Sequence, residues 1–122
     1  MDKKQKELIL KTIFWAPRVL AILFILSISI FALDVFGEGY GLAETLIALF
    51  MHLIPSILLI VILSTAWRWE KIGGIIFLTI CLIFTIFFDT YERIVGFLIL
   101  TCPLLLIGGL FLAAPYLKKR FK

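Results

Sequence analysis

Five polar side chains stand inside or at the edge of long apolar runs, where polar groups are unusual: Asp34, His52, Ser56, Thr85 and Thr101. Polar groups that face lipid are costly, so such residues turn toward the inside of a helix bundle. Asp34 and His52 are titratable, and an imidazole changes its charge near neutral pH. The pattern predicts either a polar pocket for a ligand or a proton, or hydrogen bonds between helices that only hold a bundle together.

Two prolines stand near the same depth in the second and fourth apolar runs, at Pro55 and Pro103. A proline inside a helix removes one backbone hydrogen bond and kinks the helix. Kinks at one level in two helices would open a small pocket, with His52 and Thr101 at its edge. This is where the sequence predicts ligand or proton chemistry.

A second group of candidate residues combines aromatic and charged side chains at the ends of the apolar runs. Tryptophan favours the headgroup level of a membrane, and basic side chains bind lipid phosphates there. The group therefore predicts lipid headgroup recognition. The alternative is architectural, with Arg18 and Glu70 forming an ion pair that fixes the register of two helices. The members are Trp15, Arg18, Trp67, Arg68, Trp69 and Glu70.

Motifs for catalysis or metal binding are absent from the sequence. It has no nucleophile and base pair, glycine-rich phosphate loop, HExxH motif or acidic metal cluster. One histidine is too few for a structural metal site, and Cys81 and Cys102 lack CxxC spacing. We expect no metal and no cofactor, and we interpret both thiols as small apolar residues. An intramembrane enzyme or redox protein is a residual alternative that no motif supports.

The composition indicates which elements must position these side chains. Hydrophobic residues make up 63% of the 122 residues, and the mean hydropathy is +1.17. Soluble domains have about 45–50% apolar residues, whereas a spanning helix needs about 20 of them in a row. The sequence therefore predicts a single all-α domain, an integral membrane bundle of four transmembrane helices.

The four spans are expected at about residues 17–36, 45–67, 72–88 and 94–117. Residues 1–14 are expected to form a basic interfacial segment, either a short helix on the membrane surface or a frayed lysine-rich tail. The first span is long and no Ala-x-Ala site ends it, so we expect it to be retained rather than cleaved as a signal peptide.

The basic residues predict the orientation of these spans. Five lie in the N-terminal tail or at the start of the first span, two follow the second span, and four end the chain, which makes 11 of the 12. Only Arg93 lies on the opposite side. By the positive-inside rule both termini are cytoplasmic, in a cell membrane. No basic face interleaved with aromatic residues is present, so nucleic acid is not an expected partner.

Five blocks carry a family resemblance: Trp15–Arg18, Phe31–Phe36, His52–Pro55, Ala66–Glu70 and Gly73–Gly74. In combination they resemble a family of small prokaryotic four-span membrane proteins of unknown function. The resemblance extends from about Trp15 to Tyr116. It implies a prokaryotic cytoplasmic membrane, and it implies no activity.

The expected function is that of a non-enzymatic accessory, lipid-binding or assembly component with membrane lipids as partners. The alternative is a small transporter or proton-coupled permease that uses His52 and Asp34. Small residues at Gly108, Gly109 and Ala113 predict close helix packing, within the chain, in a homo-oligomer or with another membrane protein.

Overall fold

The computed structural model describes residues 2–37, 39–87, 89 and 92–121. Within these residues the chain forms four helical stretches, each long and apolar enough to cross a membrane. The predicted all-α, four-helix class is confirmed. The elements are α1 (Lys3–Phe31), a 3₁₀ turn (Ala32–Gly37), α2 (Leu42–Arg68), α3 (Glu70–Phe87), the short α4 (Ile94–Gly96), a π-helical turn (Phe97–Thr101) and α5 (Cys102–Phe121).

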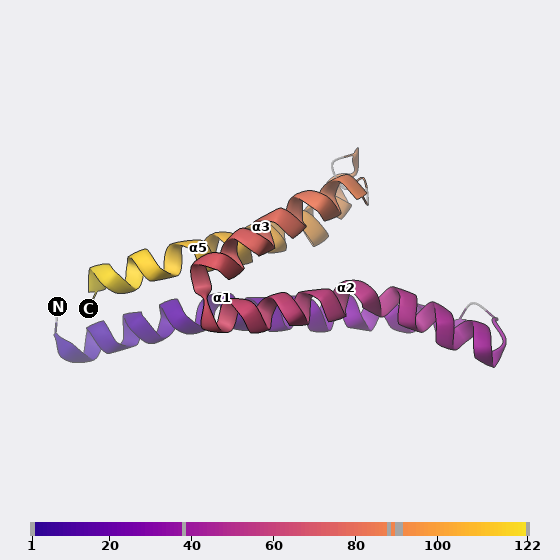
Figure 1. Ribbon diagram of the computed structural model, residues 1–122, viewed down its shortest axis with the longest axis horizontal. Helices are drawn as coiled ribbons and strands as arrows, with labels where there is room; N and C mark the ends of the chain where they lie inside the picture. Colours follow the sequence, from indigo (N-terminus) through magenta and orange to yellow (C-terminus); the bar gives the residue numbers. More distant parts are fainter. Residues whose placement is uncertain (1, 38, 88, 90–91, 122) are drawn as a thin grey trace.

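The helices form two antiparallel pairs that meet at one end and separate at the other. Helix α1 packs against α2, α3 packs against α5, and further contacts join α1 to α5 and α2 to α3. Figure 1 shows the α3–α5 pair tilting away from the α1–α2 pair. Both termini lie at the same end, which we call the basic end. The opposite end, with the 3₁₀ turn and Arg93, is the far end. The assignment of the basic end to the cytoplasm remains a prediction from charge.

Helix α1 joins two segments that the sequence analysis separates. The expected interfacial segment 1–14 and the first span form one helix, Lys3–Phe31, with Pro17 inside it. The Asp2 side chain accepts a hydrogen bond from the Gln5 N–H at 2.8 Å, and the Gln5 side chain accepts one from the Asp2 N–H at 3.3 Å. This capping box satisfies two backbone donors, and it explains why the helix starts at residue 3.

Helices α2 and α3 are joined by a single residue, Trp69, whose φ and ψ are −123° and 85°. The tight turn brings the two backbones together at Ala66 and Gly73. A Cβ atom on Gly73 would lie 2.1 Å from the Cβ of Ala66, so only glycine fits this approach. The turn fixes α3 against α2 at the basic end.

At the far end the helices extend to different positions. Helix α1 ends at Phe31 and α2 begins at Leu42, three residues before the expected start of the second span. Some residues to which the sequence analysis assigned a tail, a loop or a helix end lie outside the described residues: Met1, Glu38, Phe88, Thr90, Tyr91 and Lys122.

The fourth span contains a π-helical turn directly before Pro103. Within this turn the Cys102 N–H donates to the carbonyl of Phe97, five residues earlier instead of four. In a regular helix the Pro103 ring would clash with the carbonyl of Ile99. We attribute the π turn to this clash, because one extra residue in the turn moves that carbonyl away from the ring.

The core lies between the two pairs and extends from Ala66, near the basic end, to Phe84, near the far end of α3. The rings of Phe77 on α3 and Phe111 on α5 stack with centroids 5.6 Å apart. In each apolar span only 22–28% of the residues are buried, so most apolar side chains face outward, as lipid contact requires. The core comprises Ala21, Phe24, Ile25, Leu59, Ile62, Leu63, Ala66, Phe77, Cys81, Phe84, Leu104, Ile107 and Phe111.

Two glycines allow α3 and α5 to approach closely. A Cβ on Gly74 would lie 2.6 Å from the backbone nitrogen of Leu112, and one on Gly108 would lie 2.8 Å from Leu78 Cδ2. Gly109 would meet nothing within 4 Å. Close packing inside the chain therefore uses Gly108, whereas Gly109 faces outward.

This difference gives a matched pair of variants. We expect Gly74→Ala to lower the free energy of unfolding by about 1–3 kcal/mol, because the new methyl group overlaps the backbone of α5. Gly109→Ala should be neutral or stabilising by up to about 1 kcal/mol, since alanine is the better helix former. Unfolding in mixed detergent micelles measures both. Equal effects would contradict the packing described here.

Candidate functional site

The basic end contains a buried arginine whose hydrogen bonds all stay inside the protein. Arg18 on α1 is 1% exposed. Its Nη1 donates to Glu70 Oε2 at 3.2 Å and to the Phe14 carbonyl at 2.5 Å, and its Nη2 donates to the Trp67 carbonyl at 2.9 Å. The guanidinium thus links α1 to the α2–α3 turn. Among the described residues its Nε has no hydrogen-bond partner.

Aromatic rings enclose the same guanidinium. The Arg18 Cζ atom lies 3.7 Å from the ring centroid of Phe14, 5.1 Å from that of Trp67 and 5.4 Å from that of Phe111. A cation over a ring face is attracted by the ring quadrupole, and the attraction is larger where water is excluded. The rings therefore replace part of the hydration that burial removes.

Lys118 at the end of α5 is a third charged member that the sequence analysis missed. Its Nζ lies 2.5 Å from Glu70 Oε1, so Glu70 bridges two cations. Arg18, Glu70 and Lys118, the basic-end triad, bind α1, α3 and α5 to one another. The sequence contains a signal for this contact. Lys118 directly follows the fourth apolar run, Glu70 lies just before the third, and both positions belong to the same end of the bundle.

The other members of the predicted headgroup group lie on the surface. Trp15, Trp67, Arg68 and Trp69 have exposed side chains. The Trp15 and Trp67 rings meet edge to face with centroids 5.8 Å apart, and the Arg68 guanidinium lies 5.3 Å from the Trp69 ring. Because Arg18 is paired with Glu70, Arg68 is the arginine of the predicted group whose side chain stays accessible.

Ser56 of the predicted polar pocket contacts a different residue from those expected. It is 2% exposed, and its hydroxyl accepts a hydrogen bond from Ser29 Oγ at 3.1 Å. The one hydroxyl proton of Ser29 is shared between Ser56 Oγ and the Ile25 carbonyl of its own helix, which lies 2.8 Å from Ser29 Oγ. The pair joins α1 to α2. Ser29 was missed because a lone serine in an apolar run usually bonds only to its own helix.

Thr85 and Thr101 form the second polar contact. Their hydroxyl oxygens are 2.8 Å apart, across the interface between α3 and the π turn. Cys81 Sγ lies 3.5 Å from the Thr101 carbonyl, and the Thr85 hydroxyl donates to the Cys81 carbonyl at 2.7 Å. In apolar surroundings these hydroxyls satisfy each other and the backbone.

Asp34 and His52 do not join these contacts. Both side chains are exposed, and His52 Nδ1 bonds to the Ala48 carbonyl of its own helix at 2.8 Å. Within the described part of the chain no hydrogen bond links Asp34 to His52, and no group of three or more His, Cys, Asp or Glu side chains could hold a metal ion. The expected pocket is thus divided: Ser56, Thr85 and Thr101 make contacts between helices, whereas Asp34 and His52 are exposed.

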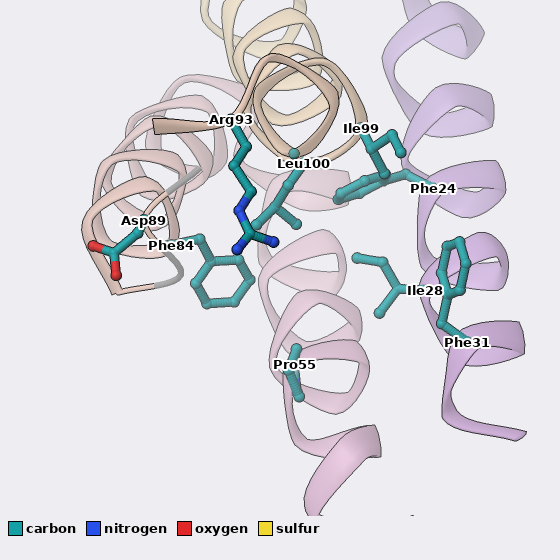
Figure 2. A pocket seen from close by; sticks show the side chains of 10 residues that line it. Phe24, Ile28, Phe31, Pro55, Phe84, Asp89, Arg93, Ile99 and Leu100 are labelled. Carbon is teal, nitrogen blue, oxygen red and sulfur yellow. The ribbon is translucent and has the colours of Figure 1, made fainter. Parts of the chain in front are cut away.

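A cavity lies where the two helix pairs separate toward the far end. We call it the wedge cavity; its volume is about 400 Å³, and Figure 2 shows its lining. A neighbouring cavity of about 490 Å³ shares Ile28, Phe31 and Pro55 with it and adds His52. The wedge cavity is lined by Phe24, Ile28, Phe31, Pro55, Phe84, Asp89, Arg93, Gly96, Ile99 and Leu100.

The two prolines do not share this cavity. Pro55 lines both far-end cavities, whereas Pro103 lines a separate one with Leu20 of α1. The sequence analysis placed them at one depth, but it could not show that they face different interfaces. Arg93, treated there only as a topological exception, lines the wedge cavity.

The basic-end triad yields a stability prediction. We expect Glu70→Gln to lower the free energy of unfolding by about 3–5 kcal/mol, because it leaves the buried Arg18 charge without a counter-ion. Lys118→Gln should lower the free energy of unfolding by about 1 kcal/mol or less, because Lys118 is partly exposed to solvent. Arg68→Gln on the surface is the control, expected within about 0.5 kcal/mol. Unfolding midpoints in mixed micelles give the ranking, and Glu70→Gln behaving like Arg68→Gln would refute a structural role for the triad.

Comparison with known proteins identifies the family of this chain, but it assigns no activity to it. No curated protein and no solved structure matches the chain. One family model matches residues 1–122 in full, and its description is a domain of unknown function, DUF7670. The chain, with its four membrane-length helices, therefore belongs to the DUF7670 family.

Proposed function

We propose that this protein is a non-enzymatic, lipid-binding component of a prokaryotic cell membrane, and that it holds one acyl chain of a lipid in the wedge cavity. The observation that carries the proposal is the cavity itself: about 400 Å³ of mostly apolar space between two helix pairs. This volume falls within the range of about 300–1,000 Å³ that is usual for ligand sites.

The lining suits a hydrocarbon chain. Eight of the ten lining residues are apolar or glycine, and Phe24 and Phe84 also belong to the core. Phe31 and Ile99 are 59% and 52% exposed, so the cavity reaches the outer surface of the bundle. A chain could therefore enter from the bilayer without first crossing water.

An empty wedge of this kind would be unfavourable. Apolar walls with no atoms opposite them lose dispersion contacts. Water gains little in such a space, because it needs two to four polar partners, and among the described lining residues only Asp89 and Arg93 offer charged groups. A lipid chain supplies the missing contacts at little cost, since it is already in the surrounding solvent.

The basic end supports the same proposal from the other side of the bundle. Arg68, Trp69 and Lys71 are exposed next to the rigid basic-end triad. Basic residues at a membrane surface attract anionic headgroups by about 1 kcal/mol each. We assign this end to anchoring at the membrane surface, while the far end holds the bound chain.

The permease alternative has less support. It needs Asp34 and His52 to share a polar path, and both lie exposed at the margin, with His52 bonded to its own helix. The buried polar contacts, Ser29 with Ser56 and Thr85 with Thr101, are paired hydroxyls that carry no charge. Proton-dependent uptake in proteoliposomes that is lost in His52→Ala would favour the permease instead.

Filling the cavity tests the proposal. Ile28 lines both far-end cavities and is partly buried, so Ile28→Trp should occupy the space of the lipid chain. The control is Leu26→Trp, which adds the same ring to a lipid-facing position of the same helix, 55% exposed. After gentle extraction, native mass spectrometry should find phospholipid on the wild type and on Leu26→Trp, and several-fold less on Ile28→Trp. Equal retention by all three proteins, or none by the wild type, would overturn the proposal.

A further inference from the structure

Arg93 is a charged group at the wedge cavity that no residue of the described chain neutralises. Within residues 2–37, 39–87, 89 and 92–121 its guanidinium has no ion pair and no hydrogen bond. In Figure 2 the Arg93 side chain extends toward Phe84 and the apolar lining of the cavity. A guanidinium presents five N–H donors in a fork that matches phosphate or carboxylate oxygens. It therefore offers a site for an anionic group at the mouth of an apolar cavity.

The surroundings of Arg93 select against a ligand that carries only negative charge. The other charged residues described at the far end are all acidic: Asp34, Glu44, Asp89 and Glu92. Asp89 lines the wedge cavity together with Arg93. A purely anionic headgroup would be attracted by the Arg93 guanidinium and repelled by the acidic side chains around it. A headgroup that carries one negative and one positive charge would be attracted by Arg93 and by the acidic side chains.

The two charged groups of the lining are separated in a way that suits such a lipid. Figure 2 shows the Arg93 guanidinium reaching in among the apolar side chains near Phe84, whereas the Asp89 carboxylate points away from the lining. A phospholipid that carries an amine has its phosphate next to its acyl chains and its ammonium group farther out. Charge-assisted hydrogen bonds of phosphate to guanidinium and of ammonium to carboxylate are among the strongest that proteins make.

We infer that the wedge cavity binds a phospholipid with a zwitterionic, amine-bearing headgroup, whose phosphate accepts hydrogen bonds from Arg93 and whose ammonium group donates to Asp89. This inference rests on the proposed lipid-binding function and specifies its ligand.

The backbone at Asp89 decides which substitution can test its charge. Its φ is +53°, a left-handed value that aspartate adopts more readily than most residues other than glycine, and its carbonyl accepts a hydrogen bond from the Glu92 N–H at 3.1 Å. Asparagine adopts left-handed values about as readily as aspartate does. Asp89→Asn therefore removes the charge and keeps the turn.

The test compares two lipids with identical acyl chains, phosphatidylethanolamine and phosphatidylglycerol, titrated onto delipidated full-length protein and counted by native mass spectrometry. We expect the wild type to favour phosphatidylethanolamine about ten-fold, because only this headgroup carries an ammonium group that can donate a charge-assisted hydrogen bond to Asp89. Arg93→Gln should weaken both lipids about ten-fold, while Arg93→Lys should retain part of the binding. Asp89→Asn should weaken only phosphatidylethanolamine.

Arg120→Gln is the matched control, because it removes an exposed arginine from the opposite end that lines neither far-end cavity, and it should leave the ratio between the two lipids unchanged. Circular dichroism and a monodisperse elution profile establish that each variant is folded. Equal binding of both lipids, unchanged in Arg93→Gln, would overturn the headgroup assignment and leave acyl-chain binding intact; Arg93 would then only extend its stem along apolar surface. A preference for phosphatidylglycerol would also overturn the assignment. Binding of neither lipid would overturn both proposals.

Discussion

The burial of the Arg18 charge constrains the whole bundle. A guanidinium that is 1% exposed has lost nearly all of its hydration, and this costs several kcal/mol unless the protein replaces it. The replacement comes from three other elements: Glu70 at the start of α3, the Trp67 carbonyl at the end of α2, and the ring of Phe111 on α5. Since the compensation holds only if all four long helices meet at this level, the triad fixes their register at the basic end.

The geometry of the far end follows from this attachment at one end. Trp69 and the contact of Gly73 with Ala66 set α3 close to α2 at the turn, and the stacked rings of Phe77 and Phe111 continue the packing inward. Beyond mid-bundle the cross-helix polar contacts join neighbours in pairs, Ser29 with Ser56 and Thr85 with Thr101. Neither contact joins one pair of helices to the other, so the pairs are free to separate, and the wedge cavity lies in that opening.

Much of the architecture could be predicted from the sequence, because apolar run length and charge position are local properties. The four spans, the shared end of the termini and the proximity of Arg18 to Glu70 all follow from them. The shape of the candidate site does not follow, because it depends on which face each helix turns to its neighbour. His52 and Ser56 stand four residues apart on α2, yet Ser56 is buried against Ser29 of α1, whereas His52 is exposed and bonded to the Ala48 carbonyl of its own helix.

Arg18 and Arg93 show how the same side chain can serve structure or recognition in one small bundle. Both stand near the end of a span, where an arginine normally extends toward water; Arg18 is buried and Arg93 is exposed. Arg18 meets a carboxylate, two carbonyls and a cage of rings, so nothing is left for an external ligand to neutralise. Arg93 meets the apolar lining of an open cavity, and the nearest acidic residue along that lining, Asp89, points elsewhere. A charge that the chain satisfies by itself stabilises the fold; a charge left beside an open apolar cavity, as at Arg93, is where we propose that a lipid headgroup binds.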